Sequence, residues 1–433
     1  MSLTVIGIVG FVILLLLFFL GFPVGFAMAL VGLVSFCYVV SAQSGLSLLA
    51  IDVFSSFSSY SLTVIPMFIF MGSIAFYSGM SGRLYDSTYK FLGRARGGLA
   101  MATSVACAGF AAICGSTTAS AAAMGKVTLP EMKRYNYDPA LATGCVASGG
   151  TLGILIPPST VFIIYGIMTE QSIGKLFISG IIPGIILTIL FVITIYILCR
   201  RNPNLAPPGA RATWKEKIMS LFGVVEMLIL FALVMGGLFV GFFTPTEAGA
   251  VGAAGALVIT LARRTLTWQG FVDSLIDTTR ISCMVFIIVT GAIIFGHFLA
   301  VTRIPLEAAD WLGALPLPRL AIFGLIIVMY FIGGCLMDSL ALITLTIPIL
   351  YPIILALGFD PIWFGVVIVL CCEMGVITPP VGINVFVIRG VAPEVPLETI
   401  FRGIFPFLGA IIVNIGIVIA FPQVALFLPS LMR

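Results

Sequence analysis

The sequence has few charged residues and a single histidine. Charged side chains make up 9% of its 433 residues, hydrophobic residues make up 61%, and the mean hydropathy is +1.23. Water-soluble domains carry about 25% charged residues, so this chain has too few charges to form a soluble globular domain. Apolar runs of about 20 residues recur along it, which indicates an all-α polytopic membrane protein.

Motifs for catalysis and metal binding are missing as well. The nine cysteines form no CxxC pair, and no HExxH motif or paired acidic motif occurs in the apolar runs. An enzyme working inside the membrane needs such groups, so the chain is not expected to be an enzyme. The net charge of +4 is spread over the ends of apolar segments, which argues against nucleic-acid binding.

No water-soluble domain is expected, because the longest polar stretch covers only about residues 200–217 and is interpreted as a linker. Residues 1–21 have neither a basic start nor a small-residue cleavage site. They are therefore predicted to form a first span and not a cleaved signal peptide. Hydropathy predicts spans near residues 3–20, 22–41, 62–80, 135–166, 177–199, 218–240, 247–262, 281–300, 361–388 and 403–428.

Two further apolar segments, about 97–130 and 319–357, have small and polar residues at their centres. The central stretches are CGSTTASAAAMG and GGCLMDSLALIT. Each segment is long enough to enter the membrane and return, so each is predicted to be a re-entrant helical hairpin.

The distribution of lysine and arginine predicts the topology. With residues 83–96, 126–134, 200–217, 263–280, 389 and 402 inside, 17 of the 21 basic residues are cytoplasmic. This is the positive-inside asymmetry. Ten crossings then place both termini on the periplasmic side. The basic residues left outside are Lys175, Arg303, Arg319 and Arg433.

An internal repeat relates residues of about 62–199 to residues of about 281–428. GSIAF at 72–76 matches GAIIF at 291–295, and the later matches are Asp138-Pro139 with Asp360-Pro361, Pro157-Pro158 with Pro379-Pro380, and GIIPG at 180–184 with GIFPF at 403–407. In the predicted topology the two repeats enter from opposite sides. Inverted repeats with matching breaks indicate a secondary transporter.

The repeats divide the chain into four parts. These are N-terminal scaffold helices at 1–61, a first repeat at 62–199, a linker with connecting scaffold helices at 200–280, and a second repeat at 281–433. The broken helices are predicted at about 135–166 and 361–388.

Each repeat interrupts an apolar helix with glycines and a proline pair, GGTLGILIPP at 149–158 and EMGVITPPVG at 373–382. Proline removes amide donors and frees carbonyl groups, which only protein or water can surround inside a membrane. The freed carbonyls, with hydroxyls at the breaks and hairpin tips, are hard oxygen ligands suited to a small cation. The side chains concerned are Thr151 and Thr378 at the breaks, and Ser116, Thr117, Thr118, Asp338 and Ser339 at the tips.

Other interpretations of these residues stay open. The prolines and glycines could simply kink packed helices, and Asp338 could cap a helix of the second hairpin. Glu373, just before the second break, could pair with Arg389 or be hydrogen-bonded. The half-helix that follows each break points its N-terminus at the membrane centre, which favours an anionic substrate near Ser159, Thr160 and Asn384.

Several of these stretches resemble a known family. GSTTASAAAMGKVTLPEM, GGTLGILIPPS, GGCLMDSLALITLTIPILYPI and GVITPPVGINVFV are similar to the large membrane subunit (DctM type) of tripartite ATP-independent periplasmic (TRAP) transporters. The resemblance covers nearly the whole chain. It implies an elevator-type fold of the ion-transporter superfamily in the bacterial inner membrane, a small four-helix membrane subunit (Q type), a secreted periplasmic binding protein (P type), and transport driven by Na⁺.

The resemblance also implies two sodium sites and most of their residues. The first would use Cys114, Ser116 and Thr117 with Gly153, Ile156 and Pro158. The second would use Gly334, Met337 and Asp338 with Gly375, Thr378 and Pro380. The expected ligands include the carbonyls of Ile156, Pro158, Met337 and Pro380. Cys114 departs from the serine expected at its position, so it would contribute only a carbonyl. The substrate-binding residues are predicted to be Thr151, Ser159, Thr160 and Asn384.

The sequence therefore predicts sodium-coupled import of a small organic acid, such as a sialic acid or a C4-dicarboxylate, delivered by a binding protein. The main alternative is a self-sufficient sodium–dicarboxylate symporter of the same superfamily. A channel is a further alternative, although two closed polar cages favour alternating access.

Overall fold

The computed structural model describes residues 2–209, 212–313 and 316–432, so Arg211 and Arg433 of the topology prediction lie outside the described residues. Every regular element in this part of the chain is helical, which confirms the all-α prediction. The elements are α1 (Leu3–Phe19), α2 (Val24–Val39), α3 (Ala42–Phe57), η1 (Ser61–Thr63), α4 (Val64–Tyr77), α5 (Met80–Leu92), α6 (Gly98–Cys114), α7 (Thr117–Arg134), α8 (Pro139–Leu155), α9 (Thr160–Thr169), α10 (Ile173–Arg201), η2 (Pro203–Leu205), α11 (Trp214–Leu221), α12 (Val225–Val240), α13 (Pro245–Ala262), α14 (Trp268–Thr302), α15 (Ile304–Gly313), α16 (Arg319–Leu336), α17 (Ser339–Ala356), α18 (Pro361–Gly375), α19 (Ile383–Val391), α20 (Leu397–Ala420) and α21 (Gln423–Ser430).

Seven helical segments of the described chain are long and apolar enough to cross a membrane when α8 and α9 are counted together, and the number rises to nine if each of two bent pairs is one span. The bent pairs are α3 with α4, at 52°, and α11 with α12, at 44°. Shorter apolar helices, among them α1 and α2, add to this set. The chain is thus a multi-span helical protein with bent and broken helices.

Two helices were not predicted, and a third begins earlier than its predicted span. Helix α3 occupies residues 42–57, where no span was predicted, because Asp52 and a group of serines lower the hydropathy there. The amphipathic helix α5 was also missed. Helix α14 begins at Trp268 rather than near 281, because Thr267 caps an amphipathic first part that continues directly into the apolar part.

The order of elements in α6–α10 recurs in α16–α20. In each set a helical hairpin is followed by a helix, a break, a short helix and a longer helix. The hairpin turns lie at Gly115–Ser116 and Met337–Asp338. Asp138 and Asp360, which precede the matching prolines, cap α8 and α18 in the same way by accepting two backbone N–H groups each. Local chemistry thus starts both broken helices identically.

The two sets are in close contact. Within the sets, α7 packs on α8 and α16 packs on α18. Between the sets, α20 of the second packs on α8 of the first. Gly144 of α8 lies so close to Gly403 of α20 that an added Cβ would be 2.3 Å from its carbonyl group. The glycines let these two backbones meet.

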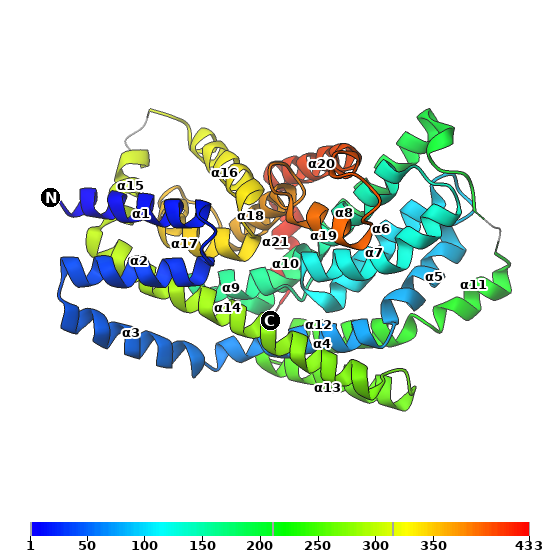
Figure 1. Ribbon diagram of the computed structural model, residues 1–433, viewed down its shortest axis with the longest axis horizontal. Helices are drawn as coiled ribbons and strands as arrows, with labels where there is room; N and C mark the ends of the chain where they lie inside the picture. The colour runs from blue at the N-terminus through cyan, green and yellow to red at the C-terminus, as the bar shows by residue number, and fades with distance from the viewer. Residues whose placement is uncertain (1, 210–211, 314–315, 433) are drawn as a thin grey trace.

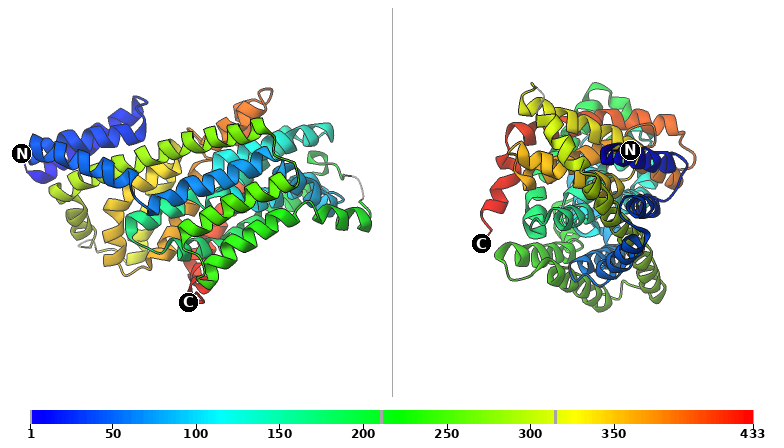
Figure 2. Two further views of the ribbon diagram at one scale, coloured as in Figure 1. Left: turned by 90° about the horizontal axis from the view of Figure 1, so that it is seen from below. Right: turned by 90° about the vertical axis from the view of Figure 1, so that its left-hand side faces the viewer.

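The long helix α14 lies beside α2 and α4, and α13 packs on α4, so these helices form a second group beside α6–α10 and α16–α20 (Figure 2). Helices α5 and α11 lie at one end of the molecule, and the N-terminus and α15 lie at the other (Figure 1). We call the first the basic end, because it carries Arg83, Lys90, Lys215 and Lys217.

At the basic end, Glu226 of α12 is buried and pairs with two arginines. One is Arg83 of α5, at 3.4 Å, and the other is Arg263, which follows α13. The carboxylate thereby ties three helices together.

Candidate functional site

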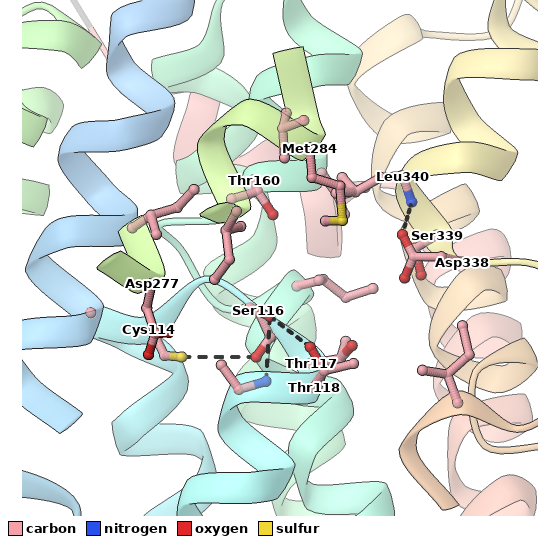
Figure 3. A pocket seen from close by; sticks show the side chains of 18 of the residues that line it. Cys114, Ser116, Thr117, Thr118, Thr160, Asp277, Met284, Asp338, Ser339 and Leu340 are labelled. Carbon is pink, nitrogen blue, oxygen red and sulfur yellow. Dashed lines mark hydrogen bonds between the residues drawn. The ribbon is translucent and has the colours of Figure 1, made fainter. Parts of the chain in front are cut away.

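A cavity of about 840 Å³ separates the two hairpin tips and borders α2, α4 and α14 (Figure 3). Ser116 and Thr117 come to it from the first tip, Asp338 and Ser339 from the second, and Thr160 from the start of α9. Segments more than 200 residues apart in the sequence therefore face one space. Further lining residues are Gly72, Ser73, Phe76 and Tyr77 of α4, Lys126 of α7, and Asp277 and Met284 of α14.

The first tip lies directly on the first break. Gly115 has a φ of +67°, and its carbonyl accepts hydrogen bonds from the backbone N–H and the hydroxyl of Thr160, at 3.4 and 3.0 Å. A Cβ on Gly153 would lie 2.4 Å from the carbonyl oxygen of Ser116. Ser116 itself caps α7 through Ala119 N–H. Tip and break are therefore one packed unit, as an ion cage built from both requires.

The second tip lies on the second break in a comparable way. A Cβ on Gly375 would lie 2.5 Å from the backbone of Gly334, and Val381 N–H donates to the carbonyl of Cys335 at 3.2 Å. Asp338 caps α17, with Oδ2 accepting from Leu340 N–H at 3.0 Å. Asp338 is thus both a helix cap and a cavity residue.

Several backbone carbonyl groups at the tips and breaks have no hydrogen-bond donor among the described residues. They include the four predicted ligand carbonyls, those of Ile156, Pro158, Met337 and Pro380, and also others such as Pro157 and Pro379. The broken helices and the extended backbone at Met337 leave these oxygens without an i+4 amide. Carbonyl oxygens that find no protein donor in an apolar segment are a suitable donor set for Na⁺.

The side chains predicted at the sodium sites differ in their hydrogen bonds and in their burial. Thr378 donates its hydroxyl to the carbonyl of Met374 at 2.6 Å, and the Cys114 thiol lies 3.9 Å from the Ser116 carbonyl. Thr117 is buried at the start of α7, and both Cys114 and Thr117 border the cavity. Among the residues predicted for the two sodium sites, Asp338 is the one with a charged side chain.

Of the four predicted substrate residues, only Thr160 lines the cavity. Thr151 donates to the carbonyl of Ser148 within α8, and Ser159 donates to the carbonyl of Ile154. Asn384 donates through Nδ2 to the carbonyl of Ala147, 3.1 Å away. These three buried side chains bond to the broken helix α8 and not to the cavity.

In the part of the chain that it describes, the structure shows neither of the two interactions suggested for Glu373, the pairing with Arg389 or a hydrogen bond. Arg389 donates to the carbonyl groups of Pro393 and Val395, and both carboxylate oxygens of Glu373 are buried without a partner among the described residues. The only histidine, His297 of α14, lies 3.4 Å from Asp52 of α3 and joins these two helices.

Sequence reasoning missed the polar residues at the other end of the cavity. Tyr77 donates its hydroxyl to Asp277 at 2.6 Å, and Lys126, which also lines the cavity, lies with its Nζ 5.8 Å from the centre of the Phe76 ring. Residues 126–134 and 263–280 were assigned to the cytoplasm because of their basic residues. The spacing could have identified Lys126. It follows Thr118 of the first tip by eight residues on the same helix, which places both residues on one face.

Comparison with known proteins identifies relatives along the whole chain. Residues 11–424 match the family described as Tripartite ATP-independent periplasmic transporter, DctM component. The chain is 37% identical to the C4-dicarboxylate TRAP transporter large permease protein DctM of Pseudomonas aeruginosa, over 88% of this chain and 89% of that protein. It is 32% identical to the sialic acid TRAP transporter large permease protein SiaM of Vibrio cholerae, over 96% of each chain.

A longer relative is the isethionate TRAP transporter permease protein DctMQ of Oleidesulfovibrio alaskensis. It is 33% identical over 92% of this chain, which matches 62% of that protein. Among solved structures, the YdaH transporter of Alcanivorax borkumensis has a similar fold, with a TM-score of 0.65 at 15% identity over 88% of this chain and 90% of that one.

Proposed function

Because the chain belongs to the DctM component family and is the large permease subunit of a TRAP transporter, not an enzyme, we propose that it imports a small organic acid by sodium-coupled alternating access. The carbonyl oxygens without a donor at the tips and breaks carry this proposal, because the four predicted ligands are among them. In the sites they form, Ile156 and Pro158 serve one Na⁺, and Met337 and Pro380 serve the other. Bound Na⁺ supplies positive charge beside the cavity, which favours the carboxylate of the substrate.

The tips also explain how ion binding and substrate binding are coupled. The residues that would hold Na⁺ on one side, such as Ser116 and Asp338, border the cavity on the other. Ordering of the tips by Na⁺ would therefore complete the walls of the substrate site. The tip hydroxyls would donate hydrogen bonds to the acid, while the Thr160 hydroxyl, which donates to the Gly115 carbonyl, holds the first tip in place.

We propose an elevator motion in which the two hairpins and broken helices move together against α2, α4 and α14. The support is that the tip–break units are tightly packed internally and that α2, α4 and α14 line a cavity beside them, with α4 touching the first tip at Gly72. In this proposal the two repeats have opposite orientations in the membrane, as the sequence predicts, and both termini lie on the periplasmic side.

The partners in this proposal are a Q-type small membrane subunit and a P-type periplasmic binding protein. The name DctMQ of the longer relative supports the first. The relatives named for C4-dicarboxylates, sialic acid and isethionate all act on small organic anions, which supports the substrate class.

The test is uptake into proteoliposomes that contain this chain and its small subunit, with binding protein outside. Labelled succinate, N-acetylneuraminate and isethionate are supplied with an inward Na⁺ gradient or with K⁺ in its place. Uptake of at least one acid only with Na⁺ and binding protein supports the proposal. Equal uptake in K⁺ contradicts sodium coupling, and uptake by this chain alone favours the self-sufficient symporter.

A further inference from the structure

We propose that Lys126 is the residue that pairs with the carboxylate of the transported acid inside the cavity, further along α7 than the first tip. This inference rests on the proposed function. It assigns a charge partner to the substrate at a distance from the tips, where neither the repeat nor the resemblance predicts one.

Lys126 lies on the face of α7 that lines the cavity. Thr118, Ala122 and Lys126 all border the cavity, and their spacing of four residues puts them on one side of the helix. Lys126 is nine residues after the helix start at Thr117, so it lies about 14 Å further along the axis. One helix thus carries a tip hydroxyl and, further along the same wall, a cation.

The ammonium group of Lys126 has no ion pair in the described part of the chain. Its one recorded interaction is with the ring of Phe76, whose centroid is 5.8 Å from Nζ and which also lines the cavity. Lys133 on the same helix differs, because its Nζ lies 2.8 Å from Glu394. Lys90 likewise pairs with Asp86. The aromatic contact holds Lys126 at the cavity wall and leaves its charge available.

The other charges that line the cavity already have partners. Asp277 accepts a hydrogen bond from Tyr77, and Asp338 accepts one from Leu340 N–H. Lys126 is the one basic residue among the described residues that line the cavity. An acid that enters therefore finds a single mobile positive charge, and the two carboxylates provide no attraction for it.

The position suits a residue that binds the acid only in passing. Lysine is a flexible point charge that gives weaker, less directional pairing than arginine. Weak pairing near one end lowers the barrier to movement along the cavity and still allows release.

The experiment measures binding from the lumen, because the binding protein sets the affinity outside. Proteoliposomes with the complete complex are loaded with increasing unlabelled acid, and initial uptake of the labelled acid is measured. The probe is whichever of succinate, N-acetylneuraminate and isethionate the wild type takes up fastest. The inference predicts that Lys126→Gln raises the internal concentration for half-inhibition by about ten-fold, whereas Lys126→Arg changes it by less than about three-fold.

Lys133→Gln on the same helix is the matched control and should behave as wild type. Melting temperatures of the purified complexes show whether a variant is folded, and Lys126→Met provides a second neutral variant if the Gln variant is unstable. If folded Lys126→Gln and Lys126→Met are inhibited at the wild-type concentration, the inference is wrong and the proposed function stands. If the wild type takes up none of the acids, the proposed function is wrong, and so is the inference that rests on it.

Discussion

Gly153 lies against the carbonyl oxygen of Ser116, so closely that a Cβ atom at this position would be 2.4 Å from that oxygen. Gly375 stands in the same relationship to Gly334 in the second repeat, at 2.5 Å. At both places a broken helix touches a hairpin tip through a residue that has no side chain.

Gly153→Ala should therefore separate the first tip from the first break. The added methyl group must push the Ser116 carbonyl away, and overpacking of this kind costs about 1–3 kcal/mol. We expect a lower melting temperature and a shift of the sodium activation curve to higher concentration, with a similar result for Gly375→Ala. Gly324→Ala is the control, because no atom lies within 4 Å of its Cβ position. Normal sodium activation in folded Gly153→Ala would remove the first tip–break contact from the ion site.

Asp338 allows the capping and ion-site roles to be measured separately. Asparagine is as good an N-cap as aspartate, so Asp338→Asn should keep α17 intact while removing the charge. We expect an unchanged melting temperature and a sodium activation curve shifted to higher concentration, because a charge in a low-dielectric site strongly affects cation affinity.

Asp338→Ala should in addition lose about 1 kcal/mol of stability through the lost cap. Ser116→Ala is the comparison at the first tip. If Asp338→Asn has wild-type sodium dependence, Asp338 is a cap and does not contribute to ion binding.

Cys114 should make transport sensitive to thiol reagents. Its side chain is buried but borders the cavity, whereas the buried cysteines that do not line the cavity are Cys107, Cys145, Cys199, Cys335, Cys371 and Cys372. A negatively charged methanethiosulfonate should inactivate the wild type, because it adds bulk and negative charge beside the first tip. The Cys114→Ser variant should be resistant. Cys283→Ser removes an exposed thiol elsewhere and should stay sensitive; inactivation of Cys114→Ser at the wild-type rate would contradict the cavity position.

Glu226 should matter for stability and not for ion binding. The Glu226→Gln variant leaves Arg83 and Arg263 without their shared counter-charge at the basic end. We expect a loss of about 1–3 kcal/mol, less than for a fully buried pair because both arginines are partly exposed to solvent. Thermal unfolding of the complex measures the loss, and the sodium activation curve of the folded protein should not move. A shifted sodium activation curve at unchanged stability would show that Glu226 affects ion binding and not stability.

The sequence predicted the helical breaks well, because proline pairs and glycines act locally and leave few alternatives. Asp138 and Asp360 were found as matching positions for the same reason. The missed features depend on packing. Asp52 in α3 and the amphipathic residues of α5 reduce hydropathy, and only tertiary contacts show that these segments are helices of the bundle.

The substrate side chains were predicted less well than the breaks. Ser159 and Asn384 follow the proline pairs as expected, but their hydrogen bonds to Ile154 and Ala147 turn them toward α8. Lys126 was assigned to the cytoplasm, since its charge is visible in the sequence and the cavity beside it is not.

The contact between Gly144 and Gly403 has a consequence for how the protein is made. The two residues are 259 positions apart, so at about 5–20 residues per second the ribosome needs roughly 10–50 seconds to supply α20 after α8. During this time α8, with its proline break and free carbonyl groups, is in the membrane without the helix that covers it. The nascent first half therefore depends on its neighbour α7, on α10 or on the insertion machinery to shield that surface until the last helices arrive.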